Sequence, residues 1–142
     1  MSTTIKLIGS DAEIARCYAV MVQLRPHLTL ADFVAQVKLQ MRSGYQLVAA
    51  LGGDTVVAVA GYRVTRSLSW GKFLYVDDLV TDAARRSQGI GKRLLDWLRA
   101  EAKRQGCQEF HLDSGTQRKD AHRFYEREGM QLLAYHYKLR VQ

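Results

Sequence analysis

The stretch that decides the fold is Phe73-Leu74-Tyr75-Val76-Asp77-Asp78-Leu79-Val80-Thr81, followed by Arg85-Arg86-Ser87-Gln88-Gly89-Ile90-Gly91. The first run is rich in aromatic and branched residues, as strands are, and the second leads into a long amphipathic helix. A helix N-terminus presents unpaired N–H groups and a positive dipole, and glycines let an anion approach the backbone. The junction is therefore predicted to bind an anion, and we expect a diphosphate.

The helix after this junction is predicted over residues 89–105. Its apolar residues form one stripe, made of Ile90, Leu94, Trp97, Leu98 and Ala102. Two other phosphate-binding loops do not fit the junction. A Walker loop needs Ser or Thr after Gly-Lys, where this chain has Arg93, and a dinucleotide fingerprint needs a third glycine, where it has Leu94.

What remains is the pattern Arg-x-x-Gly-x-Gly from Arg86 to Gly91, placed between a strand and a helix. It resembles the acetyl-CoA pyrophosphate loop of the GNAT family of N-acetyltransferases. Downstream, Asp120-Ala121-His122-Arg123-Phe124-Tyr125-Glu126-Arg127-Glu128-Gly129-Met130 resembles the family's Ala-x-x-Phe-Tyr-x-x-x-Gly-Phe helix. Its alanine and two aromatic residues share one helix face, and its glycine suits a left-handed C-terminal cap.

The resemblance implies the GNAT acyl-CoA N-acyltransferase fold. This is an α+β fold with a central mixed, mostly antiparallel sheet, flanked by about four helices in the order β-α-α-β-β-β-α-β-α-β. The patterning predicts strands near residues 4–8, 45–51, 56–64, 73–81, 109–113 and 131–141, and helices near 11–21, 30–42, 89–105 and 119–128. We expect a single N-acetyltransferase domain over residues 1–142.

The resemblance also implies which residues hold acetyl-CoA. In the family, a bulge at the end of the central strand exposes backbone groups to the pantetheine arm, which here corresponds to Leu79, Val80 and Thr81. The diphosphate would be held by Arg86, Ser87, Gln88, Gly89, Ile90, Gly91 and Lys92. No metal is expected, because the histidines and the two cysteines lack the spacing of metal ligands.

The amine acceptor must lose a proton before it attacks the thioester, because its pKa resembles that of lysine, about 10.4. Asp77 and Asp78 are the candidate bases. In a regular strand neighbouring residues point to opposite faces, so at most one of them would face the substrate. Asp77 is favoured, because the first residue of such an acidic pair lies in the substrate slot of the polyamine-acetylating branch of the family. Asp78 is the second candidate, and a chain of waters is the third.

Tyr125 resembles the family's usual proton donor to the leaving CoA thiolate. With reference pKa values of about 10 for tyrosine and about 8.5 for a thiol, full transfer is uphill by roughly 2 kcal/mol. The hydroxyl could also stabilise the thiolate as a hydrogen-bond donor without full transfer. Two positions depart from the family pattern, since Arg118 replaces a common Asn and Ala83 a common Pro. The Leu24–Leu28 loop is placed where acceptor specificity is usually set, but the sequence does not identify the acceptor.

Composition is consistent with a cytoplasmic enzyme, and the acceptor amine is expected on a small molecule or on a protein lysine or N-terminus. The 142 residues include two distant cysteines, no signal-peptide core and no membrane-length apolar run. A net charge of +7 can indicate a nucleic-acid partner, but we read it chiefly as steering of anionic CoA and as solvated surface, and it disfavours a polycationic acceptor. The predicted partners are acetyl-CoA and an amine, with no membrane. A homodimer is common in the family. The competing prediction is an inactive acyl-CoA-binding sensor or partner module.

Overall fold

The first of two compact units is built on a five-stranded sheet. The computed structural model describes residues 2–142, which form one unit up to His111 and another from Leu112 onward. The strands lie in sequence order in the sheet: β1 (Thr3–Ile8), β2 (Tyr45–Gly52), β3 (Thr55–Ser67), β4 (Gly71–Thr81) and β5 (Glu109–Leu112). Strands β1 to β4 are antiparallel neighbours, and β5 follows β4 through a helical crossover of the kind that a parallel neighbour requires.

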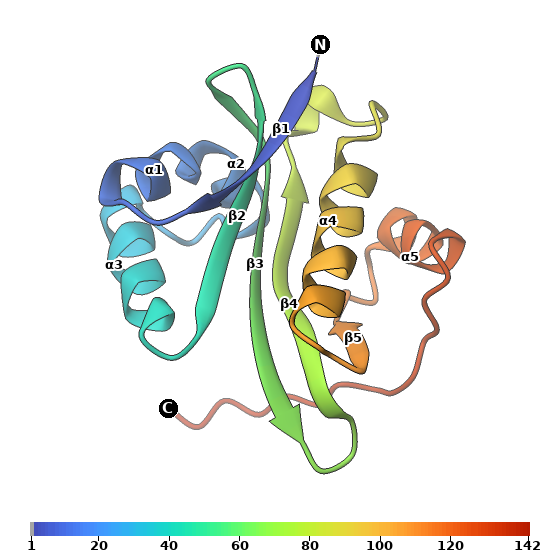
Figure 1. Cartoon of the computed structure of the whole chain (residues 1–142). Helices are drawn as coiled ribbons and strands as arrows, with labels where there is room; N and C mark the ends of the chain where they lie inside the picture. The colour runs from blue at the N-terminus through green and yellow to red at the C-terminus, as the bar shows by residue number, and fades with distance from the viewer. Residues whose placement is uncertain (1) are drawn as a thin grey trace. The chain divides into compact units, whose positions relative to one another are not determined.

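Helices cover both faces of this sheet (Figure 1). One face carries α1 (Asp11–Arg16), α2 (Tyr18–Leu24) and α3 (Leu30–Met41), and the other carries α4 (Ile90–Arg104). Helix α1 begins with a capping box between Ser10 and Glu13, and the Thr29 side chain caps α3. The helix predicted over residues 11–21 is in fact two helices, which meet at Cys17.

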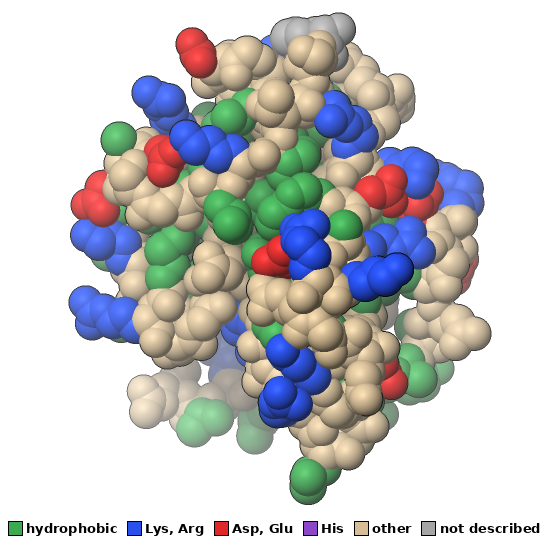
Figure 2. Space-filling model, in the orientation of Figure 1, with side chains coloured by type: hydrophobic (Ala, Val, Ile, Leu, Met, Phe, Trp, Pro, Cys, Tyr) green, Lys and Arg blue, Asp and Glu red, His purple; other side chains and the backbone are tan. Residues whose placement is uncertain are grey.

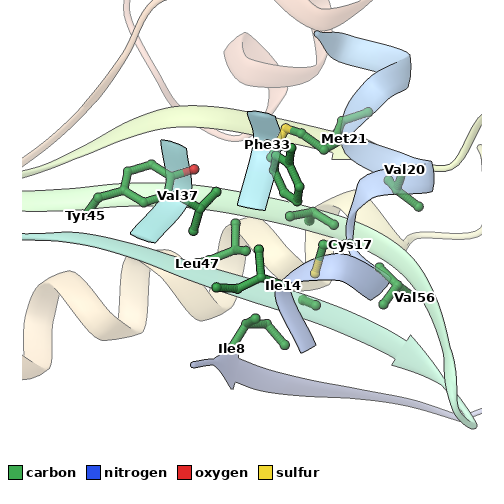
Figure 3. Packing of buried hydrophobic residues seen from close by; sticks show 13 residues of the cluster. Ile8, Ile14, Cys17, Val20, Met21, Phe33, Val37, Tyr45, Leu47 and Val56 are labelled. Atoms are coloured by element: carbon green, nitrogen blue, oxygen red, sulfur yellow. The ribbon is translucent and has the colours of Figure 1, made fainter. Parts of the chain in front are cut away.

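The main core lies between the sheet and α1–α3 (Figure 3). Ile14, Cys17, Phe33 and Leu47 are among its most deeply buried members, and each is at most 2% exposed. A second layer packs beneath α4, whose leucines are fully buried at positions 94, 95 and 98. The apolar stripe predicted for this helix therefore faces the sheet, and its charged side faces solvent.

Strand β4 contains a β-bulge at Asp77. Its register with β3 pairs Gly61 with Asp78 but Tyr62 with Val76, so Asp77 is an extra residue. The bulge breaks the alternation of faces. Both aspartate side chains consequently point to the face covered by α1–α3, instead of to opposite faces as the sequence predicted. The family resemblance placed a bulge at Leu79–Thr81, which instead pair regularly with β3.

Gly61 lies opposite this bulge, and the Tyr45 side chain packs directly over Gly61. A Cβ built on Gly61 would lie 1.7 Å from the Tyr45 hydroxyl oxygen and 2.6 Å from a ring carbon. The ring belongs to the core cluster and is 3% exposed, so it has little room to move. A glycine is thus required for Tyr45 to reach β4.

The second unit contains α5 (Lys119–Arg127) and the segments on either side of it. The His122 ring is bonded to the Gly115 carbonyl at 2.7 Å, which ties the preceding loop to the helix. Gly129 adopts φ +90° after the helix, as the sequence predicted for a left-handed cap.

The final strand predicted over residues 131–141 is not formed. These residues are in neither helix nor strand, and their large apolar side chains are exposed, namely Leu132, Leu133, Tyr135, Tyr137, Leu139 and Val141. The alternating pattern that predicted a strand supplies one apolar face, but a strand also needs a neighbouring edge for its backbone groups. The other predicted elements are present, and the single domain over 1–142 stays a prediction.

We expect Gly61→Ala to destabilise the protein by about 3 kcal/mol, because the new methyl group overlaps a core ring. Urea unfolding measures this loss as a lower midpoint. The matched control is Gly9→Ala, where a Cβ meets nothing within 4 Å and φ is not positive. Equal midpoints for the two variants would contradict the packing of Tyr45 against Gly61.

Candidate active site

The predicted anion loop lies between β4 and α4. A short 3-10 helix (Ala83–Arg85) is followed by two residues with left-handed backbone, Ser87 at φ 67° and Gly89 at φ 77°. The first backbone bond of α4 runs from Arg93 N–H to the Gly89 carbonyl, so the N–H groups of the residues between them have no acceptor within the helix. A Cβ on Gly89 would meet nothing within 4 Å, so the space above this backbone is open to a ligand.

Exposed cations surround this loop. Arg86, Lys92 and Arg93 are exposed, and Lys92 is ion-paired with Asp96 one turn further on, at 3.2 Å. On the face that Figure 2 shows, Lys and Arg side chains form separate groups instead of one continuous patch. The loop therefore combines the N–H groups of a helix N-terminus, a helix dipole and positive charge, which suits a diphosphate.

Helix α2 anchors the start of this loop through Gln23. Its side-chain oxygen accepts from Ala83 N–H at 2.9 Å, and its side-chain nitrogen donates to Asp82 at 3.2 Å. These bonds, with one from Ala84 N–H, lower the pKa of the Asp82 carboxyl. No local pattern indicates this contact, because the partners are about 60 residues apart in the sequence.

Each aspartate of the bulge is paired with its own arginine. Arg63 of β3 holds Asp77 through two parallel bonds of 2.8 and 2.9 Å. Arg25, which follows α2, donates from Nε to Oδ1 of Asp78 at 2.9 Å and from Nη2 to the Asp77 carbonyl at 3.0 Å. The carbonyl of the bulged residue is thereby satisfied by a side chain, in place of a ladder bond.

Tyr45 completes this cluster by donating to Oδ2 of Asp78 at 2.8 Å. Burial, reinforced by the neighbouring Asp78 charge, raises the pKa of the Tyr45 hydroxyl well above its usual range, so this group remains a donor. The two hydrogen bonds to Asp77 raise the pKa of Arg63. The acidic pair is thus held by two guanidinium groups and one phenol, and the sequence predicted only the acids.

A pocket of about 710 Å³ opens beside Asp78, between α2, α3 and the sheet. Its lining includes Met21, Arg25, His27, Leu28, Asp32, Phe33, Gln36, Tyr45 and Asp78. The Leu24–Leu28 loop, expected to set acceptor specificity, contributes three of these side chains. Asp77 does not line the pocket. Of the two candidate bases, Asp78 is therefore the one that an acceptor in this pocket could reach.

The far edge of β4 is open next to the same acids. Gln108 N–H bonds to the Lys72 carbonyl at 2.7 Å, which places the start of β5 beside the start of β4. Strand β5 has four residues and β4 has eleven. If β5 runs parallel to β4 from that bond, it ends before it reaches Asp77. Among the described residues, Leu79, Val80 and Thr81 therefore have a strand partner on the β3 side only.

Tyr125 lies on α5, with its ring 5.4 Å from that of Phe124. Burial raises the pKa of its hydroxyl above 10, although the charge of Arg118 lowers it in part. The phenol is therefore protonated at neutral pH and able to donate. The protonated hydroxyl is the form that a proton donor to the thiolate needs.

Neither cysteine is an activated nucleophile. Burial raises the pKa of the Cys17 thiol to about 12, and burial also raises that of Cys107. The described residues contain no group of three His, Cys, Asp or Glu side chains placed to hold a metal ion. Trp70 stacks on His111 at 3.7 Å and is absent from the pocket lining. None of the helices in residues 2–142 is long and apolar enough to cross a membrane.

Comparison with known proteins identifies the family. Residues 13–130 match the model of the Acetyltransferase (GNAT) family. The uncharacterized N-acetyltransferase YhdJ of Bacillus subtilis (strain 168) is 36% identical over 122 residues, which cover 85% of this chain and 86% of that protein. The aminoalkylphosphonate N-acetyltransferase of Salmonella typhimurium (strain LT2) is 43% identical over 54 residues, or 38% of this chain and 35% of that one.

The fold has close structural counterparts. A transcriptional regulator from Bacillus halodurans C-125 superposes with a TM-score of 0.84 at 24% identity, over 98% of this chain and 99% of that one. The fold class predicted from the sequence is confirmed, and so is acetyl transfer as the activity of the family. The motifs around Gly89 and Tyr125 and the extent of these matches lead to one conclusion: the chain belongs to the GNAT family of N-acetyltransferases.

Proposed function

We propose that this enzyme moves the acetyl group of acetyl-CoA directly to a primary amine held in the Asp78 pocket, within a ternary complex. The observation that carries the proposal is the pocket itself, with a carboxylate in its wall and an anion loop at the end of the same strand. The raised pKa values of both cysteine thiols give no support to a covalent enzyme intermediate. Two free cysteines also favour a cytoplasmic location.

We assign acetyl-CoA binding to the residues that the motif indicated. Arg86, Ser87, Gln88, Gly89, Ile90, Gly91 and Lys92 would hold the diphosphate through backbone N–H groups and two cationic side chains. Leu79, Val80 and Thr81 would offer the open edge of β4 to the pantetheine arm. When bound, acetyl-CoA supplies the thioester carbonyl that the amine attacks.

Asp78 is our first candidate for the amine binder and base, because it lines the pocket. Its carboxylate would hold the acceptor as an ammonium ion and take up one proton from it, directly or through water, which frees the nitrogen lone pair to form the bond to the acetyl carbon. Asp77, which the sequence favoured, is bound by both nitrogens of the Arg63 fork. We propose that it positions the bulge or passes the proton on through water.

Tyr125 is proposed to donate a proton or a hydrogen bond to the CoA sulfur as the carbon–sulfur bond breaks. Its raised pKa makes the donor form dominant at neutral pH, and that form is lost only as the pH rises through the raised value. The products are an N-acetyl amine and free CoA thiol. Homodimers are common in the family, and a homodimer stays a prediction for this chain.

Gly89→Asp should weaken acetyl-CoA binding by about 100-fold or more, because it puts a carboxylate and a strained left-handed residue at the anion loop. Titration calorimetry measures the affinity. Gly106→Asp is the matched control, since it also has positive φ and an open Cβ position but lies at the other end of α4. Unchanged affinity in the Gly89 variant would remove this loop from the cofactor site.

Asp78→Asn should lower kcat/KM for the amine by about 100-fold, whereas Asp77→Asn should cost about tenfold or less. A free-thiol release assay over a panel of primary amines measures both. Asparagine keeps the side-chain shape, so thermal melting separates unfolding from lost chemistry. The reverse order of the two losses would return the base role to Asp77.

Tyr125→Phe should lower kcat by roughly 10- to 100-fold with little change in acetyl-CoA affinity, because only the hydroxyl is lost. Thiol release and calorimetry on the same preparation make this comparison. Phe124→Leu, on the same helix, controls for packing. If acetyl-CoA binds but no amine yields thiol in the unmutated enzyme, the acyl-CoA sensor replaces the enzyme as the better account.

A further inference from the structure

Arg25 both bonds to the acidic pair and lines the acceptor pocket. It lies in the loop after α2, lines the pocket, and its side chain is 41% exposed. Its hydrogen bonds to the two aspartates use Nε and Nη2. A guanidinium group has five N–H donors in a planar fork, so Nη1 still has two to offer a ligand. No bond within residues 2–142 uses that nitrogen.

Asp78 likewise retains capacity for a ligand. Its Oδ1 accepts from Arg25 and its Oδ2 accepts from Tyr45, while its side chain remains 16% exposed. A carboxylate offers about four lone-pair sites, so an ammonium group can join without displacing Arg25. The pocket wall therefore presents one available anion and one available cation next to each other.

The charges in this cluster already balance. Asp77 and Asp78 carry two negative charges, and Arg25 and Arg63 carry two positive ones. A simple ammonium ion would add an uncompensated positive charge beside two guanidinium groups, and a diamine would add two. The remaining charged or titratable side chains of the pocket, His27 and Asp32, are exposed at its rim. An acceptor with its own anionic group would keep the balance.

We propose that the acceptor is a zwitterion: an amine with a carboxylate or phosphonate a few bonds from its nitrogen, whose anionic group binds Arg25 while its ammonium group binds Asp78. This inference rests on the proposed function of the pocket and adds the class of substrate. The chain's net charge of +7 favours such an acceptor over a polycation. The locally similar Salmonella enzyme is named for an aminoalkylphosphonate acceptor, which belongs to this class.

The test compares amines of similar size that differ in the anionic group. The acceptors are 2-aminoethylphosphonate and β-alanine, with n-propylamine as the monocation that lacks an anionic group and 1,4-diaminobutane as the dication. Thiol release gives kcat and KM, and calorimetry gives the affinity of each amine for the CoA-loaded protein. A preference for one acid-bearing amine over the other distinguishes a phosphonate from a carboxylate acceptor.

Arg25→Gln should raise KM for the acid-bearing amines by about 10- to 100-fold more than it raises KM for n-propylamine, because only those amines lose an ionic partner, whereas a loss of kcat through the disturbed Asp78 should be shared by all amines. Arg25→Lys should restore part of the loss, because it keeps the charge but not the fork. Arg63→Gln is the matched control. It removes the other arginine of the cluster, which does not line the pocket, and should affect all amines alike.

Two outcomes would overturn the zwitterion assignment. One is that Arg25→Gln raises KM equally for the acid-bearing amines and for n-propylamine. The other is preferred use of n-propylamine or the diamine by the unmutated enzyme. Failure of the enzyme proposal differs, because then no amine yields thiol although acetyl-CoA binds. In that case, binding of 2-aminoethylphosphonate or β-alanine that depends on Arg25 would still support this ligand class, and its absence would reject both.

Discussion

The extra residue in β4 is the constraint on which the acceptor side of this enzyme depends. A regular strand would send Asp77 and Asp78 to opposite faces, one toward α4 and one toward α1–α3. The bulge turns both toward α1–α3, where only compensating cations allow two carboxylates to lie so close together. The bulged backbone therefore requires Arg25 and Arg63 as partners of the two carboxylates, whatever their part in the reaction.

This arrangement links the Leu24–Leu28 loop to β4. Arg25 bonds to both the Asp78 side chain and the Asp77 carbonyl, while Gln23, two residues earlier, holds the entry to the proposed anion loop. The C-terminal end of α2 and the residue that follows it thus contact both proposed sites through two polar side chains. A shift of α2 would change the geometry on the amine side and on the cofactor side together.

Local signals predicted most of the fold, whereas contacts between distant residues were missed. The glycine turns, the capping residues and the stripe of α4 act within a few residues, so their elements were predicted near the observed bounds. Asp77 and Asp78 were predicted on opposite faces because alternation assumes a regular ladder, which the bulge at Asp77 interrupts. Tyr45 and Arg25 lie 33 and 53 residues from Asp78, and no short pattern reports such pairs. The last predicted strand failed because alternation does not supply a pairing edge.

The close approach of Tyr45 to Gly61 restricts the order in which this protein can change over evolution. A side chain at position 61 is blocked while the tyrosine ring stays, so the ring must be lost first. Its loss also removes the hydroxyl that steadies Asp78. Descendants of this chain should therefore keep the glycine and the tyrosine as a pair or give up both, and the second route passes through a form with an altered acceptor pocket.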